Sequence, residues 1–443
     1  MSKRFQLTPE QLALQEQRKA KRQKLLEQTT PAPTLPQTRF LSRPWIDLKQ
    51  DLHPAPKILT WNLLAQSLVR RELFPTSDCL KAAQRLPMLA AEVVAYDADI
   101  MCCQEVDSLD KLLPNLEPTY STHYAAGPGK KHGCLIAFKE DWEKLADHLI
   151  EFDEQEIRTE GNERARRGSA FRTRNIASLV ALKSRSQPGR GVVIGTTHLF
   201  WHPSYTYERC RQAGIFLREI RKFQSDNKLN SWPCILAGDF NFSPDDPAYA
   251  LLVGDSLTDG HKERLEASRV VHVSIDPTAV PVTASSIKED EDQAGDPDRV
   301  ITNARRATIE DGLLSDDELV ALFSQSSPLR SAYDEGLKAH RESNDDLRTF
   351  GQRVGLPVEK KGYNEPEYTS YTHYWKTVLG KRLFCGWCLT NNPRLYILLV
   401  TFTSRNMRDW PPHIAPTNSV TACLSKAFAA VITYLFVHSS IFQ

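Results

Sequence analysis

The sequence CILAGDFNFSP at residues 234–244 is the stretch from which the fold of the chain is best interpreted. Its apolar run ends at Gly238, and Asp239, Phe240 and Asn241 follow before polar residues and a proline that favour a loop. This pattern predicts a buried strand with a carboxylate and a carboxamide at its end. Because alternate residues of a strand share a face, Asp239 and Asn241 can reach one site. An ordinary Asp/Asn turn after a strand is the alternative.

Three apolar segments upstream also end in a polar side chain. KILTWN ends at Asn62, ADIMCCQE ends at Glu105 and VVIGTTH ends at His198, while residues 80–96 and 207–224 carry apolar side chains at helical spacing. Strands alternating with helices predict an α/β architecture with a site at the strand ends. An isolated buried carboxylate is strongly unfavourable, so Glu105 calls for a partner such as a metal ion. A surface glutamate at a strand end is the alternative. The apolar face of the first helix is expected to contain Leu80, Leu86, Leu89, Val93 and Val94.

Composition limits the classes of partner and compartment. A formal charge of +1 on 443 residues excludes a polycationic chain, so any nucleic-acid contact must use local patches. Residues 153–174 contain one such patch, which we expect to be a surface loop able to contact phosphates. Its arginines include Arg164, Arg166, Arg167, Arg172 and Arg174. Nine irregularly spaced cysteines, and residues 1–5 without the apolar core of a secretory signal, predict an intracellular protein.

The chain divides into an extension, a folded domain and a tail. Residues 1–50 are expected to be a basic helix and a proline-rich linker. The helix is either a mobile solvated arm or a nuclear address or RNA-contacting segment. The folded domain is expected over residues 55–379, with a disordered acidic insertion near 284–318.

Residues 380–443 differ in kind from the rest of the chain. After Lys381 the only acidic residue is Asp409. The apolar run at 427–442 is shorter than the ~20 residues that a membrane-spanning helix needs, so we expect no membrane contact. Cys385 and Cys388 match the C-x-x-C spacing of a redox pair or half a zinc site, but no second pair lies nearby, which favours neither function.

The four strand ends together predict phosphodiester cleavage assisted by Mg²⁺, with Mn²⁺ able to replace it. Carboxylate and amide oxygens suit this ion, which binds few protein carboxylates and keeps waters and substrate phosphate as its other ligands. Glu105 is expected to anchor the ion and Asn62 to help orient it. Asp239 would position or deprotonate the attacking water. Asn241 and His198 would hold phosphate oxygens as negative charge develops.

Four short motifs resemble those of the endonuclease/exonuclease/phosphatase superfamily. They are Trp-Asn-Leu at 61–63, Gln-Glu-Val at 104–106, Thr-His-Leu at 197–199 and Gly-Asp-Phe-Asn at 238–241. Residues 63–65 and 200–203 resemble its deadenylase-related branch, and residues 132–133, 207–212 and 371–375 resemble the fungal Ngl-type RNA exonucleases. The resemblance covers about residues 55–379.

This resemblance implies a two-sheet α/β sandwich flanked by helices, with the site at one edge. It also implies Mg²⁺-dependent 3′-to-5′ removal of nucleotides from RNA, as in ribosomal RNA processing or poly(A) removal. Trp201 and His202 would lie near the substrate, where base stacking is useful. Asn175 and Arg209 are further candidates for substrate binding. We expect a monomer located in the nucleus or the cytoplasm.

The sequence departs from the family pattern after Leu379. The family continues there with an Asp that heads a strand and closes with Ser-Asp-His, whereas this chain has Gly380-Lys381 and no later Asp-His pair. Gly-Lys is what a G followed by the splice-donor sequence GTAAG would encode. We therefore hypothesise that residues 380–443 are translated intron or a faulty gene model, that the fold is incomplete at this end, and that catalysis is impaired. A transcript that matches these residues through a genuine stop codon would contradict the hypothesis.

Two other functions remain open from the sequence. The first is a catalytically inactive RNA-binding or scaffold protein, which would keep the groove and lack the chemistry. The second is a phosphodiesterase or phosphatase that acts on a small phosphorylated molecule, a substrate class that the superfamily also includes.

Overall fold

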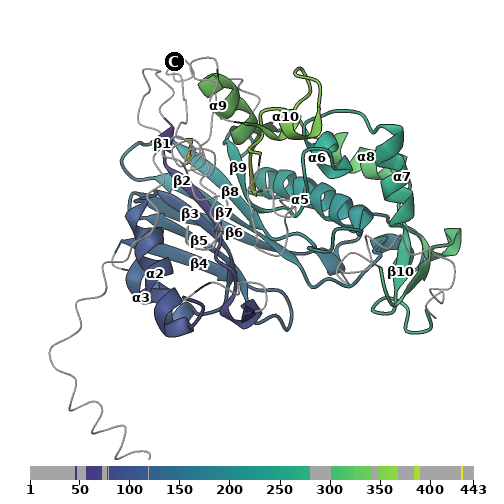
Figure 1. Ribbon diagram of the computed structural model, residues 1–443, viewed down its shortest axis with the longest axis horizontal. Coiled ribbons are helices and arrows are strands. Elements are labelled where there is room, and N and C mark those ends of the chain that lie inside the picture. The colour runs from purple at the N-terminus through teal and green to yellow at the C-terminus, as the bar shows by residue number, and fades with distance from the viewer. Residues whose placement is uncertain are drawn as a thin grey trace, which may run out of the picture. The chain divides into compact units, whose positions relative to one another are not determined.

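The structure of the protein is a computed structural model (Figure 1). It describes residues 56–71, 77, 79–117, 119–279, 301–324, 326–341 and 348–367, together with the backbone of three short strands at 45–46, 384–389 and 431–432. The predicted basic helix, the aromatic stretch after residue 367 and most of the tail lie outside the described residues.

A four-stranded sheet carries the first two site residues. Its order is β2 (Ile58–Asn62), β3 (Ile100–Val106), β5 (Gly133–Lys139) and β4 (Tyr120–Ala125). β2 and β3 are parallel, and the other pairs are antiparallel. Helices α2 (Ala82–Ala95) and α3 (Leu109–Leu116) cover its outer face (Figure 1).

A six-stranded sheet carries the other site residues. Its order is β12 (Arg330–Ser331), β13 (Phe384–Leu389), β9 (Cys234–Asp239), β8 (Gly191–Thr197), β7 (Ile176–Ser184) and β6 (Trp142–Glu151). Only β8 and β9 are parallel. The tail thus contributes the backbone of β13, which pairs with β9 along its whole length.

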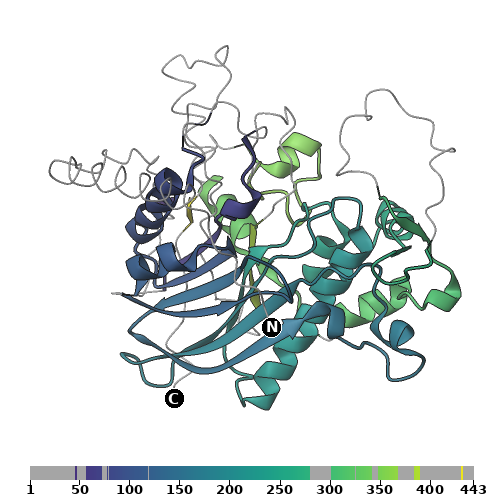
Figure 2. The ribbon, with the colours of Figure 1, turned by 90° about the horizontal axis from the view of Figure 1, so that it is seen from below.

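The two sheets pack face to face, because their strands alternate between two cores. Val180 and Leu182 of β7 point into the core shared with the first sheet, whereas Leu179 and Ala181 point to the opposite core beneath the helices. The described helices on that side are α5 (Thr206–Asp226), α6 (Pro247–Leu252), α7 (Asp259–Ala267) and α8 (Asp316–Ser324). Figure 2 shows the resulting layers of helix, sheet, sheet and helix, which confirms the predicted α/β sandwich.

The remaining described elements are small. They are β10 (Val270–His272) paired with β11 (Ala304–Arg306), β1 (Trp45–Ile46) paired with β14 (Val431–Ile432), α4 (Glu163–Arg167), α9 (Ala332–Arg341), α10 (Phe350–Val354), and the 3₁₀ turns η1 (Gln66–Leu68), η3 (Phe152–Glu154) and η5 (Ile309–Asp311). None of the helices in the described ranges is both long and apolar enough to span a bilayer.

Two sequence expectations differ from the structure. Residues 301–318, assigned to the disordered insertion, instead form β11, η5 and the start of α8. Val94, expected on the apolar face of its helix, is 41% exposed, and the charged Arg85 is buried there. The acidic residues of 301–318 are ordered because tertiary partners such as Arg158 neutralise them. Arg85 is buried because backbone carbonyl oxygens accept hydrogen bonds from its guanidinium.

Candidate active site

The site residues meet because parallel strand pairs end at the same edge of each sheet. In the first sheet, Asn62 at the end of β2 lies opposite Gln104 of β3, one residue before Glu105. In the second, a single parallel bridge joins His198, just beyond β8, to Asp239, the last residue of β9. The facing sheets therefore bring all four predicted residues to one place.

Asn62 connects the two carboxylates. Its Nδ2 donates to Glu105 Oε1 at 2.7 Å and to Asp239 Oδ2 at 2.8 Å. The three side chains are buried, with Glu105 at 2% and Asp239 at 0% exposure. Carboxylates in such surroundings require donors or cations to offset their desolvation. One amide nitrogen thus holds two acidic groups from different sheets side by side.

His198 lies beside both acids. Its Nδ1 is 3.9 Å from Glu105 Oε1, and its Nε2 is 3.6 Å from Asp239 Oδ2. Both distances exceed those of a hydrogen bond. The imidazole side chain is 17% exposed, more than either acid, so it forms the solvent-facing side of this group.

Glu105 and Asn241 both adopt left-handed backbone conformations, with φ of 55° and 54°. Such conformations are unfavourable for residues with a Cβ and recur at functional sites. Glu105 lies in an irregularity of the β3–β5 pairing between Cys103 and Val106, which redirects its side chain as bulges do. Asn241 donates from Nδ2 to the carbonyl oxygen of Leu199 at 2.8 Å, so part of its amide holds the segment that follows His198.

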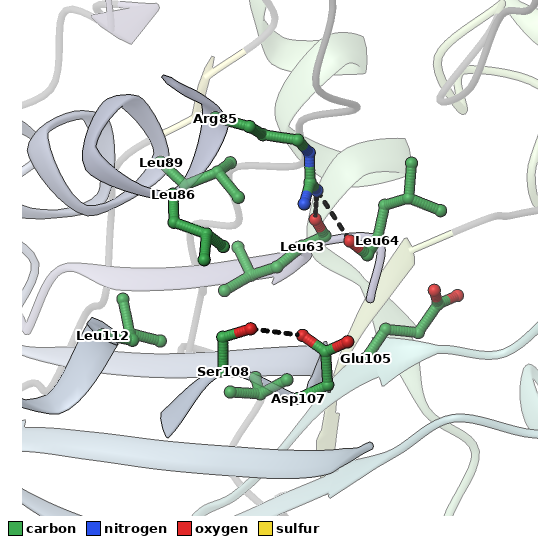
Figure 3. A pocket seen from close by; sticks show the side chains of 10 residues that line it. Leu63, Leu64, Arg85, Leu86, Leu89, Glu105, Asp107, Ser108 and Leu112 are labelled. Atoms are coloured by element: carbon green, nitrogen blue, oxygen red, sulfur yellow. Dashed lines mark hydrogen bonds between the residues drawn. The ribbon is translucent and has the colours of Figure 1, made fainter. Parts of the chain in front are cut away.

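The loop after β2 is fixed around Glu105 by Arg85, as Figure 3 shows. The guanidinium of Arg85 reaches from α2 and donates to the carbonyl oxygens of Leu63 and Leu64, the second at 2.7 Å. The amide of Ala65 in turn donates to Glu105 Oε2 at 3.1 Å. Burial lowers the pKa of Arg85, although nearby acids raise it. Sequence reasoning missed this residue, but its place four residues before Leu89 on the apolar stripe was a usable signal.

The sequence profile of the endonuclease/exonuclease/phosphatase family matches residues 59–321, which include the residues of this site described so far. The chain belongs to that family. The resemblance drawn from the four motifs is therefore confirmed.

Similar proteins of this family are known in fungi. A probable RNA exonuclease of Schizosaccharomyces pombe is 29% identical over 334 residues, which cover 72% of this chain and 63% of that protein. RNA exonuclease NGL2 of Saccharomyces cerevisiae is 26% identical over 414 residues, 84% of this chain and 76% of that protein. Among solved structures, ANGEL2, a 2′,3′-cyclic phosphatase, is 24% identical with a TM-score of 0.39 and covers 45% of this chain and 57% of its own. The chain thus spans less than two thirds of the first relative.

In this member of the endonuclease/exonuclease/phosphatase family, Asn175 supports His198 through the backbone. Its Nδ2 donates to the carbonyl oxygen of His198 at 2.8 Å, and its Oδ1 accepts from the amine of Lys130. Burial lowers the pKa of Lys130, while Cys134, Asp153 and Glu105 raise it. Lys130 was not foreseen, although the Gly-Pro-Gly turn before it places a lysine at the start of β5.

The other three predicted substrate-binding residues differ in exposure. Trp201 is 46% exposed, whereas His202 and Arg209 are buried. Arg209 donates to the carbonyl oxygens of His202 and Pro203, the second at 2.8 Å, and contacts Asp246 at 3.4 Å. In this structure, therefore, Arg209 holds the loop that presents Trp201, and its contact with substrate stays a prediction.

A complete protein cage for a metal ion is absent from the part of the chain that the structure describes, since no three His, Cys, Asp or Glu side chains are suitably grouped there. The two buried carboxylates nonetheless place hard oxygen ligands at one point, while Asn62 faces them with its Nδ2 and its Oδ1 accepts from the amide of Leu64. This set suits an ion such as Mg²⁺, which takes one or two carboxylates and completes its shell with water and phosphate.

Proposed function

We propose that this protein is a Mg²⁺-dependent 3′-to-5′ exoribonuclease of the deadenylase-related type. The observation that carries the proposal is the pairing of Glu105 and Asp239 through Asn62, with His198 beside them. Family membership and the fungal relatives named as RNA exonucleases support it. Mn²⁺ would be able to replace Mg²⁺.

Glu105 would hold the ion, and Asn62 would orient the Glu105 carboxylate through its Nδ2. When bound, the ion would offset negative charge on the phosphate. The loop fixed by Arg85 holds Glu105 in place, because the amide of Ala65 takes one of its oxygens. Preorganised groups of this kind stabilise a transition state without a further cost of reorganisation.

Asp239 would orient the attacking water and accept its proton, because its carboxylate lies at the base of the site. His198 would donate to a phosphate oxygen from the solvent-facing side. Asn241 would add a second amide contact while it keeps Leu199 in place. Donors aimed at developing charge typically contribute two to three orders of magnitude in rate, about 2.7–4 kcal/mol each.

The test uses RNA labelled at either end, incubated with the full chain and Mg²⁺ beside an Asp239→Ala control. Stepwise shortening from the 3′ end by the wild type alone would support the proposal. Shortening from the 5′ end, or equal activity of the control, would contradict it.

A second function is favoured by the sequence after Leu379, where no Asp-His pair follows. A protein without these groups would keep the site described above and bind RNA without cleaving it. Tight RNA binding with no shortening, at any Mg²⁺ concentration, would support this alternative.

A further inference from the structure

The loop between β6 and β7 contains two classes of arginine. Four of its six arginines are neutralised by nearby acids, and the remaining two, Arg172 and Arg174, are exposed. The neutralised pairs are Arg158–Glu318 at 2.6 Å, Arg164–Asp311 at 3.0 Å, Arg166–Glu156 at 3.0 Å and Arg167–Glu163 at 2.9 Å. Across the residues that the structure describes, neither Arg172 nor Arg174 forms an ion pair.

Hydrogen bonds of two buried neighbours hold the backbone around these two arginines. They alternate with Thr173 and Asn175, which are each 7% exposed. Thr173 accepts from the side-chain amide of Gln212 at 3.0 Å, and Asn175 donates to the His198 carbonyl at 2.8 Å. Arg172 and Arg174 are exposed on either side of the buried Thr173, and Arg174 has a left-handed backbone conformation with φ of 55°. The guanidinium groups therefore project into solvent from a segment that is tied directly to the site.

A further positive charge lies next to Arg174. A Cβ built on Gly129 would be 3.5 Å from Arg174 Nη1, so this guanidinium lies over the turn that carries Lys130. Burial, and then the charge of Arg174, lower the pKa of Lys130. Like charges held this close repel each other, and a bound anion would relieve that repulsion.

An exposed aromatic ring lies three residues beyond His198 in the chain, because Trp201 is 46% exposed. Trp201 packs edge-on against Phe200, and Phe200 contacts Phe171, with ring centroids 6.4 Å and 4.8 Å apart. Phe171 directly precedes Arg172. Aromatic packing thus joins the tryptophan to the arginine segment.

We propose that Arg172, Arg174 and Trp201 form a binding surface for single-stranded RNA beyond the nucleotide being removed. The arginines would contact successive phosphates, and the indole would stack on a base. Proteins that bind single strands without sequence preference combine a positive track with exposed rings in this way. The inference rests on the proposed exoribonuclease function and concerns only how the retained strand is held.

The first test measures binding of a fluorescent RNA of about 20 nucleotides, longer than the roughly 4–16 that one such surface covers. The wild type, the double variant Arg172→Gln/Arg174→Gln and the control Arg185→Gln are compared in Ca²⁺ buffer over a range of salt. Arg185 is exposed just beyond the opposite end of β7. Each lost phosphate contact lowers the slope of log affinity against log salt by roughly 0.7, so the double variant should lose about 1.4.

The control should keep the wild-type slope. An unchanged slope in the double variant, or an equal loss in the control, would overturn the inference. With Mg²⁺, the double variant should also raise KM for the long RNA far more than KM for a dinucleotide. Equal increases for both would instead place these arginines at the scissile nucleotide, contrary to the proposal.

Trp201→Ala should weaken binding of the long RNA on the order of tenfold, because stacking on a ring commonly contributes that much per base. Trp201→Phe keeps a ring face and should retain most of the affinity. Equal loss in both variants would overturn the stacking role.

The two proposals fail differently. If wild-type protein shortens RNA and the variants match it, only the binding surface is contradicted. If it binds RNA by these residues without shortening it, only the catalytic proposal is contradicted. If it does neither, both are overturned.

Discussion

Glu105 and Asp239 accept hydrogen bonds from one and the same nitrogen, Nδ2 of Asn62, at 2.7 Å and 2.8 Å. The two carboxylates belong to different sheets, so this amide fixes the distance between the two buried acids and also joins the layers of the sandwich. Its Oδ1 accepts from the amide of Leu64 at 2.9 Å, which sets the orientation of the amide. Because one side chain makes all three hydrogen bonds, we expect any substitution of Asn62 to disturb the site.

Asn62→Ala is expected to lower activity on RNA by about two to three orders of magnitude, as the loss of one preorganised donor does. It should also lower the free energy of unfolding by about 1–3 kcal/mol, because buried acceptors lose their donor. Urea unfolding and initial rates measure the two effects. Asn115→Ala is the matched control, since Asn115 is exposed and contacts only the carbonyl oxygen of Lys111. Wild-type rates in Asn62→Ala would refute the assigned role.

Arg85→Met is expected to lower the free energy of unfolding by about 1–3 kcal/mol, since the carbonyl oxygens of Leu63 and Leu64 lose a buried donor. Activity should fall as well, because the loop then holds Glu105 less firmly. Arg85→Lys should recover only part of the stability, because an ammonium can replace Nη2 but not Nη1, which donates to Gln66 Oε1 at 3.3 Å. The exposed Arg71→Met serves as control and should change stability by no more than about 0.5 kcal/mol. If thermal and urea unfolding show Arg85→Met to be as stable as the wild type, Arg85 does not support the loop after β2.

Gly238→Ala is expected to push β8 and β9 apart at the site. The added Cβ would lie 2.3 Å from the carbonyl oxygen of Thr197, a backbone atom that cannot rotate away. Overpacking of this kind costs about 1–3 kcal/mol, and the shift would also separate Asp239 from His198. Gly260→Ala is the control: no atom lies within 4 Å of its Cβ, so in helix α7 it should stabilise by about 0.5–1 kcal/mol. If both variants are as stable as the wild type, the close approach of β8 and β9 does not require a glycine at position 238.

The sequence predicted the strand ends because their signal is local. A polar residue that closes an apolar run identifies Asn62, Glu105, His198 and Asp239 without any knowledge of neighbours. Strands β4 and β6 were missed because much of each is exposed, so their polar residues conceal the apolar pattern. The sequence therefore predicts the site best where the chain is most buried.

The sequence could not show which charged side chains find partners far away in the chain. Residues 301–318 were assigned to disorder because they are acidic, yet Asp311 is held by Arg164 at 3.0 Å and Glu318 by Arg158 at 2.6 Å. Arg85 was overlooked because its acceptors are backbone carbonyls 21 and 22 residues away. Composition rules treat each charge as solvated, and tertiary pairing overrides them.

Glu365 is a buried acid outside the site, and it makes stability depend on pH. It is 0% exposed, and its Oε1 accepts from the Tyr249 hydroxyl at 3.0 Å. Burial, and then the nearby charge of Asp334, raise the pKa of Glu365 to about 8. The folded protein therefore keeps this proton at a pH where the unfolded chain has released it.

The sign of the effect follows from proton counts. Below about pH 4.3 both states hold the proton, and the stabilisation from Glu365 is complete. Between about pH 4.3 and about pH 8 only the folded state binds this proton, so the free energy of unfolding falls as pH rises, by at most about 1.4 kcal/mol per pH unit.

Glu365→Gln cannot ionise at residue 365 and should lack this fall in stability. Urea unfolding of both proteins between about pH 5 and pH 9 measures the difference, which should widen in favour of the variant as pH rises. Parallel profiles would show that Glu365 is ionised in the folded protein throughout.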